Sequence, residues 1–96
     1  MKIWVDDMRP APKGYVAARS VEETIRIIER TESRGEPIEL IDLDHDLGEY
    51  AQFGGDAIRI LDYLVERKTF CPVRIHTANP VGRANMERII RRFWPD

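Results

Sequence analysis

The segment of residues 38–48 constrains the fold of this chain more than any other, because an apolar run turns there into a cluster of acids around one histidine. Residues 38–43 carry apolar side chains at both parities of strand alternation, which is typical of a central strand covered on two faces. Asp42 interrupts this run, and we assign it a structural role. Residues 44–46 then place charged groups at the mouth of a core, where they are unfavourable unless a cation or a substrate binds them. The sequence therefore predicts a functional site at the end of the molecule where this strand stops.

Length and charge limit the classes of protein to which the chain can belong. A chain of 96 residues has material for one core, so we expect a single domain over residues 1–96. A net charge of -2 argues against binding double-stranded nucleic acid through bulk electrostatics, but leaves room for local contact with a nucleotide or an RNA end. No apolar segment reaches the roughly 20 residues that span a bilayer, and the first residues lack the apolar middle of a signal peptide. We therefore expect no membrane partner and a cytoplasmic protein.

Strand-like and helix-like segments alternate along most of the chain. The β-type runs predict strands over residues 2–5, 15–18, 38–43 and 70–75. Ser20 and Glu23 form a capping box that predicts a helix to about residue 31 or 32, and apolar spacing over residues 56–65 predicts a second helix. Asn79 followed by Pro80 is typical of the start of a third helix. This order of elements predicts an α/β fold with a mainly parallel sheet.

Three of the predicted strands end in polar clusters. Because ligands bind outside the carboxyl ends of parallel strands, we expect residues 6–7, 44–46 and 76–79 to converge in space. Their carboxylates would repel one another without a counter-ion, and a hard divalent cation accepts such oxygens. We therefore predict a metal site, most simply for Mg²⁺ with Mn²⁺ or Zn²⁺ as alternatives, formed by Asp6, Asp7, Asp44 and Asp46. The alternative is that some of these acids cap helices, pair with Arg9 or face solvent.

The only two histidines of the chain, His45 and His76, both fall at this predicted edge. Two imidazoles can divide the base and acid roles at a phosphorus centre, so we predict them as catalytic residues in unassigned order. They could instead orient their neighbours through hydrogen bonds, or bind zinc together with an acid. Guanidinium groups, a hydroxyl and the free amides of a helix start suit phosphoryl oxygens. The predicted phosphate-binding residues are Arg9, Thr77, Asn79 and Arg83.

The motifs at the strand ends resemble a known family. The acids after the first and third strands, together with Thr77, are similar to the acidic pocket, phosphoacceptor aspartate and switch threonine of bacterial response-regulator receiver domains. In place of their first helix the chain has a proline-rich loop, and it lacks their fifth strand with its lysine. A shortened branch, the cyclic-phosphate processing receiver domains, is more similar. It matches in Asp6-Asp7-Met8-Arg9-Pro10, Leu43-Asp44-His45-Asp46-Leu47-Gly48 and Ile75-His76-Thr77-Ala78-Asn79-Pro80.

This resemblance implies both a fold and a function. The implied fold is a three-layer, receiver-like (flavodoxin-like) α/β sandwich whose truncated, mainly parallel sheet has four strands in the order 2-1-3-4. The implied activity is that of a phosphoesterase acting on cyclic phosphates, such as nucleotide or RNA 2′,3′-cyclic phosphate ends, with the acids and both histidines as active residues. The alternative is a non-catalytic receiver-type module that binds or accepts phosphate. The edge left open by the absent fifth strand favours a homodimer.

Overall fold

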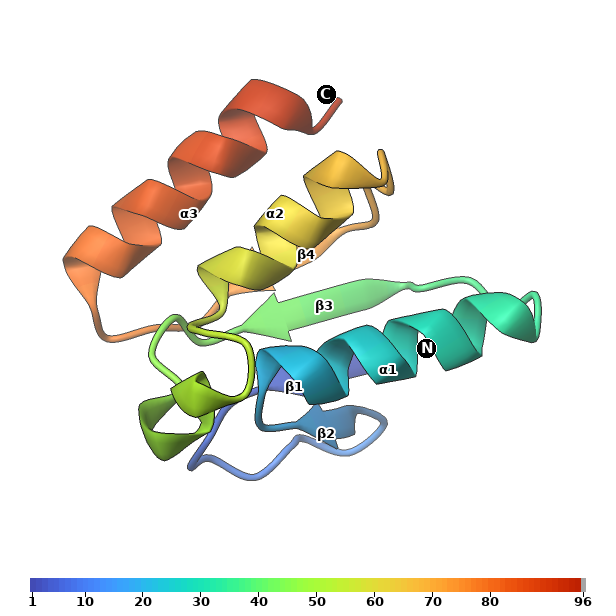
Figure 1. Ribbon diagram of the computed structural model, residues 1–96, viewed down its shortest axis with the longest axis horizontal. Coiled ribbons are helices and arrows are strands. Elements are labelled where there is room, and N and C mark those ends of the chain that lie inside the picture. Colours follow the sequence, from blue (N-terminus) through green and yellow to red (C-terminus); the bar gives the residue numbers. More distant parts are fainter. Residues whose placement is uncertain (96) are drawn as a thin grey trace.

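Four parallel strands form one sheet in the order β2-β1-β3-β4 in a computed structural model that describes residues 1–95 (Figure 1). The strands are β1 (Lys2–Val5), β2 (Val16–Ala18), β3 (Leu40–Leu43) and β4 (Val73–Ile75). In register, Ile3 of β1 lies between Val16 and Ile41, and Ile41 lies opposite Val73. The expected receiver-like α/β fold and the strand order 2-1-3-4 are therefore confirmed. The parallel arrangement brings the carboxyl ends of all four strands to one edge.

The first and third helices begin where the capping signals predict them, and the second begins at Ile58, within its predicted range. They are α1 (Val21–Ser33), α2 (Ile58–Glu66) and α3 (Pro80–Phe93), with a short 3₁₀ helix, η1 (Gly48–Gln52), in the loop after β3. The Ser20 hydroxyl accepts a hydrogen bond from the Glu23 amide, and the Asn79 side chain accepts one from the Gly82 amide. Each bond satisfies a backbone donor that the first turn of a helix leaves free. The third and fourth strands are shorter than predicted, and the β3 ladder begins only at Leu40.

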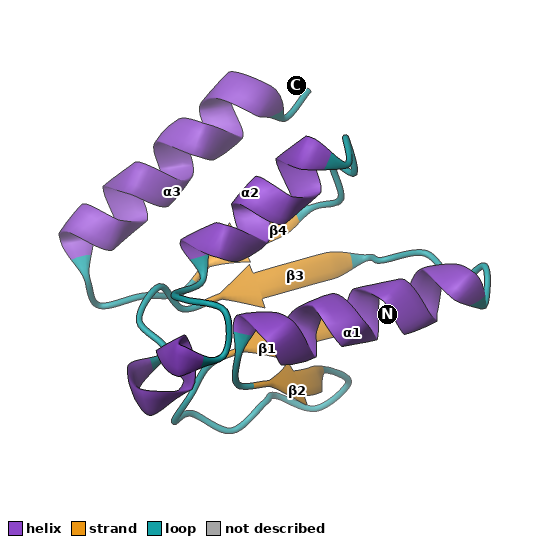
Figure 2. Cartoon of the chain, in the orientation of Figure 1, coloured by secondary structure: helices purple, strands orange, loops and turns teal. Residues whose placement is uncertain are grey.

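The helices cover only one face of the sheet. In Figures 1 and 2, α1 and α2 lie in front of the strands and α3 lies beside α2. The step from β2 to β3 and the step from β3 to β4 advance in the same direction across the sheet, so right-handed crossovers place both helices on the same side. The residues described therefore do not form the third layer of the expected sandwich. A loop stands where a receiver domain has its first helix.

Burial along the strands follows this one-sided arrangement. Ile3, Val5, Ile41 and Leu43 point towards the helices and are fully buried. Side chains on the opposite face include exposed Lys2 and Arg74 and half-buried Trp4 and Leu40. The prediction that β3 is covered on two faces holds for burial, since Ile41, Asp42 and Leu43 are all buried, but helices cover only one of the faces. Its outward-facing Asp42 is nevertheless 4% exposed, because side chains from the site cover it.

The core continues from the sheet into the elements that carry the site. Leu47, in the loop after β3, and Met86 of α3 are both fully buried. At the end of α3, Phe93 lies outside this core with 41% of its surface exposed, although helical spacing after Pro80 predicts it to be buried. Trp94 closes that end instead, because its indole nitrogen donates a hydrogen bond of 2.7 Å to the Cys71 carbonyl. None of the described helices is long and apolar enough to cross a membrane.

Candidate functional site

Three carboxylates meet at the carboxyl ends of the two central strands. Asp6 and Asp7 follow β1, Asp44 follows β3, and one oxygen of each lies within 4.8 Å of the others. The loop after β3 approaches closely: a Cβ at Gly48, whose φ is +54°, would lie 2.6 Å from an Asp7 carboxylate oxygen. Glycine at this position therefore allows the loop to rest on the cluster. Three converging carboxylate oxygens are a suitable donor set for a hard divalent cation.

Asp6 is the buried member of this cluster, which we call the acid triad (Asp6, Asp7 and Asp44). One of its oxygens accepts hydrogen bonds of 2.9 Å from the amides of both Met8 and Arg9, and the other lies 3.0 Å from His76 Nε2. Burial alone raises the pKa of Asp6, but the two amides and the histidine outweigh this effect, so the net pKa is lower than usual. The carboxylate is thus held in its charged form and orders the loop after β1.

The lowered pKa of Asp6 predicts a pH-dependent contribution to stability. A carboxyl group with a depressed folded-state pKa stabilises the fold above its usual value of 3.8 and loses this contribution as the pH falls through the lowered pKa. In a metal-chelating buffer, Asp6→Asn should therefore reduce the free energy of unfolding by about 2 kcal/mol at pH 7. The difference from the parent should shrink below pH 3.8. Urea denaturation across pH measures this difference, with Asp62→Asn at an exposed position of α2 as a control. A difference that grows in acid would contradict the prediction.

His76, directly after β4, lies between two carboxylates. Its Nδ1 is 2.6 Å from an oxygen of Asp42, and its Nε2 is 3.0 Å from Asp6. Both ring nitrogens can donate only when the imidazole carries both protons. Trp4 stacks on the ring with centroids 3.8 Å apart and an interplanar angle of 7°. Asp42, assigned only a structural role from sequence, therefore contacts a predicted catalytic residue directly.

His45 forms a second histidine–carboxylate pair, on the side of the site near α3. Its Nδ1 lies 2.9 Å from Asp46. The side-chain amide of Asn79 donates to the two oxygens of the same carboxylate at 3.1 and 3.3 Å. The hydrogen bond with His45 lowers the pKa of Asp46 most, burial opposes it, and Asn79 adds to the lowering. Asp46 is not one of the three acids that converge within 4.8 Å. The structure thus brings together three of the four predicted metal ligands and places the fourth beside His45.

The first turn of α3 lies against the His45 ring. A Cβ on Gly82 would come within 2.5 Å of His45 Cγ, closer than real Cβ contacts allow. Only glycine fits this contact without displacing the ring, so the start of α3 fixes the position of the imidazole.

This contact predicts a substitution effect opposite in sign to helix propensity. Gly82→Ala should lower the free energy of unfolding by about 2 kcal/mol, because the methyl group overpacks the site. In a His45→Ala background the same change should stabilise the protein by about 0.5 kcal/mol, since alanine favours helix and nothing blocks it. Urea denaturation of the four proteins measures both effects. Stabilisation by Gly82→Ala in the parent would show that the ring does not occupy this position.

The predicted phosphate-binding residues occupy unequal positions. Arg9 is half-exposed beside the acid triad, with its Nε 3.9 Å from Asp6 and a long 3.4 Å hydrogen bond to the His76 carbonyl. Arg83 is instead directed to the backbone, donating to the Ile75 carbonyl at 3.2 Å. The Thr77 hydroxyl accepts a hydrogen bond of 3.2 Å from the backbone amide of Asn79, so both residues shape the turn into α3. Of the two arginines, Arg9 is the one that forms an ion pair with the acid triad among the described residues.

A family model for the cyclic-phosphate processing receiver domain matches residues 1–92 of the chain. The chain belongs to this family. No curated protein and no solved structure gave a match. The family's name assigns this receiver domain a role in cyclic-phosphate processing, and the matched residues include all three strand-end clusters.

Three residues of this receiver domain shape the site although the sequence predicts no site role for them: Asp42, Trp4 and Gly82. Asp42 lies within a strand, and its partner His76 is 34 residues away. A signal was present, because an acid in an otherwise apolar strand needs a partner. Trp4 carries a weaker signal, since it shares the outward parity of β1 and lies opposite Asp42 in register. The contact of Gly82 with His45 depends on the docking angle of α3, for which the sequence contains no signal.

Proposed function

We propose that this receiver domain hydrolyses cyclic phosphodiesters, such as the 2′,3′-cyclic phosphate ends of nucleotides or RNA, with a divalent metal bound by the acid triad. The observation that carries the proposal is the convergence of three carboxylate oxygens within 4.8 Å, next to His76. Like charges so close favour a cation, and Mg²⁺ suits an all-oxygen donor set that leaves positions for water and phosphate. Such a cation polarises a phosphoryl oxygen and stabilises the charge that develops on it.

The hydrogen bonds of the two histidines suggest how the proton transfers are divided. His45 Nδ1 is engaged by Asp46, while its Nε2 has no hydrogen-bond partner among the described residues. In our proposal this Nε2 accepts a proton from the attacking water, as expected of an imidazole oriented by a carboxylate. His76 carries both ring protons when it donates to Asp42 and Asp6, and in our proposal it supplies one of them to the leaving group.

These roles balance the reaction. Water forms a new P–O bond, one ring P–O bond of the cyclic phosphate breaks, and the released ribose oxygen takes up a proton. The product is a phosphomonoester. Arg9 and Thr77, with the free amides at the start of α3, would hold the non-bridging oxygens during the displacement. Asp42 and Asp46 then act as positioning residues, because each contacts a histidine to which the proposal gives a proton transfer.

A turnover assay tests the proposal. Adenosine, guanosine, cytidine and uridine 2′,3′-cyclic phosphates are incubated with the protein in Mg²⁺, Mn²⁺, Zn²⁺ or chelator, and phosphomonoester formation is followed by ³¹P NMR. We expect metal-dependent hydrolysis by the parent and by Arg88→Ala, whose side chain is exposed on α3. The double variant His45→Ala, His76→Ala should be inactive. Full turnover by the double variant, or by the parent in chelator, would sink the proposed mechanism.

Asp44 itself supports one competing function. Its backbone amide donates to the Val5 carbonyl at 2.9 Å, and its carboxylate has no hydrogen-bond partner among the described residues. A carboxylate placed in this way beside two others could accept phosphate, as in a signalling receiver. Incubation with a small acyl phosphate donor tests this alternative. Phosphate that stays on the parent, and is lost in Asp44→Asn, would favour signalling over hydrolysis.

A further inference from the structure

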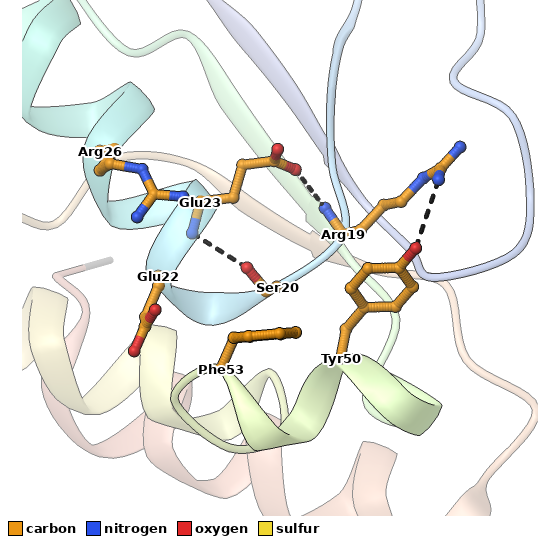
Figure 3. Close-up of a pocket in the computed structure, with 7 residues that line it drawn as sticks. All are labelled: Arg19, Ser20, Glu22, Glu23, Arg26, Tyr50 and Phe53. Carbon is orange, nitrogen blue, oxygen red and sulfur yellow. Dashed lines mark hydrogen bonds between the residues drawn. The ribbon is translucent and has the colours of Figure 1, made fainter.

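A cavity of about 310 Å³ opens where the start of α1 faces η1 (Figure 3). Arg19, Glu22 and Arg26 line it from the α1 side, and the aromatic rings of Tyr50 and Phe53 line it from the η1 side. We call it the aromatic pocket. Its volume falls at the lower end of the about 300–1,000 Å³ that small-molecule sites occupy. None of these five residues takes part in the proposed hydrolysis.

The aromatic pocket adjoins the acid triad through two backbone connections. The Asp6 amide donates to the Ala18 carbonyl at 3.0 Å, and Arg19 follows directly in the chain. On the other side Gly48, which lies against Asp7, begins η1, and Tyr50 follows two residues later. A ligand in the aromatic pocket therefore lies along the same edge of the sheet as the acid triad.

The loop that carries Phe53 is fixed although the ring is exposed. The Phe53 carbonyl accepts a hydrogen bond of 3.1 Å from the Glu22 amide. The next residue, Gly54, has φ +110°, and a Cβ there would lie 3.0 Å from the Val21 side chain. The ring is 44% exposed, with its centroid 6.4 Å from that of Tyr50. A rigid backbone that presents an aromatic ring to solvent is suited to stacking.

Some polar side chains of the aromatic pocket form hydrogen bonds within the chain, and others remain able to bind a ligand. Glu23 is used, since its carboxylate accepts from the Arg19 amide at 2.7 Å. The side chains of Glu22 and Arg26 make no hydrogen bond within residues 1–95, and Figure 3 shows them on the opposite side of Phe53 from Tyr50. The Arg19 guanidinium makes only a long bond of 3.4 Å to the Tyr50 hydroxyl. A carboxylate acceptor and guanidinium donors therefore remain available around two aromatic rings.

We infer that the aromatic pocket binds the nucleobase of the substrate and favours guanine. This inference rests on the proposed function, because the base is what a nucleotide carries beside its cyclic phosphate. Stacking on Phe53 accepts any base. Arginine pairs with the O6 and N7 acceptors of guanine. The Glu22 carboxylate accepts hydrogen bonds from the N–H groups on the other edge of the guanine ring. Adenine and the pyrimidines each lack part of this set.

Equilibrium binding in chelator tests the inference without turnover. The probes are guanosine 3′-monophosphate, cytidine 3′-monophosphate and ribose 5-phosphate. We expect guanosine 3′-monophosphate to bind at least about tenfold more tightly than ribose 5-phosphate, and Phe53→Ala to remove about tenfold. Phe53→Tyr keeps the ring and should bind like the parent. Arg26→Gln should reduce the preference for guanosine over cytidine. Phe93→Ala, which removes a similarly exposed ring from α3, is the matched control.

The outcomes separate this inference from the proposed hydrolysis. Equal affinity for guanosine 3′-monophosphate and ribose 5-phosphate, or equal losses in Phe53→Ala and Phe93→Ala, would overturn the nucleobase site. Tight, Phe53-dependent binding without hydrolysis of guanosine 2′,3′-cyclic phosphate in Mg²⁺ would support the aromatic pocket and contradict the hydrolysis. Turnover of glycerol 1,2-cyclic phosphate with the same KM as the guanosine substrate would support hydrolysis and contradict the aromatic pocket.

Discussion

Asp44→Asn is expected to reduce the proposed metal-dependent hydrolysis by about 100-fold or more, and at the same time to stabilise the metal-free protein. In the proposed hydrolysis, activity falls because only two of the three converging carboxylates would remain to bind the cation. Stability rises by about 1 kcal/mol, because the substitution removes repulsion within the acid triad. Activity and stability are expected to change in opposite directions, because the charge of Asp44 is needed to bind the proposed cation but is not needed for folding.

Thermal unfolding with and without Mg²⁺ measures this effect. The parent should unfold at a higher temperature in Mg²⁺, since a ligand that binds only the folded state stabilises it. Asp44→Asn should lose this shift. Asp46→Asn is the matched control: its carboxylate contacts His45 and Asn79, so it should keep the shift while losing activity. An Asp44→Asn protein still stabilised by Mg²⁺ would place the cation elsewhere.

Asp42→Ala is expected to lower the free energy of unfolding by about 3 kcal/mol, a large effect for a residue on the face that no helix covers. The Asp42 side chain is 5% exposed and lies 2.6 Å from His76, whose side chain is 15% exposed. Removing the carboxylate leaves the imidazole under Trp4 without its closest partner. The cost is large because burial prevents water from replacing that partner.

A double-mutant cycle separates this pair from general damage to the core. Asp42→Ala, His76→Ala and the double variant are compared by urea denaturation. The double variant should cost at least about 1 kcal/mol less than the sum of the single variants, because each single change leaves the other group unpaired. Additive effects would mean that the two groups do not stabilise one another. Hydrolysis should fall in both single variants, since Asp42 orients the proposed proton donor.

Much of the fold and the centre of the site follow from local signals in the sequence. The capping residues Ser20 and Asn79 mark two helix starts that depend only on neighbouring amides. The convergence of Asp6, Asp7 and Asp44 follows from a single topological fact, the parallel direction of β1 and β3. Such features are predictable because they depend on chain order and on the direction of strands.

Features that depend on side-chain packing could not be predicted in this way. The contact of His76 with Asp42 requires the register between β3 and β4, and its stacking on Trp4 requires the rotamers of two rings. The third layer was expected from the resemblance to receiver domains and from the apolar side chains at both parities of β3, and neither signal shows what covers the second face of the sheet. In the structure, the outward Asp42 is covered by His76 rather than by a helix.

The uncovered face of the sheet gives neighbouring positions very different tolerance of substitution. Lys2 and Arg74 are exposed there, so replacing either should change stability by no more than about 0.5 kcal/mol. Trp4 shares this face but stacks on His76, and its indole nitrogen donates to the Arg9 carbonyl at 3.1 Å. In a saturation library selected for activity, Lys2 and Arg74 should accept most amino acids and Trp4 few. The tolerance of each position on this face therefore distinguishes side chains that only face solvent from side chains that support the site at the strand ends.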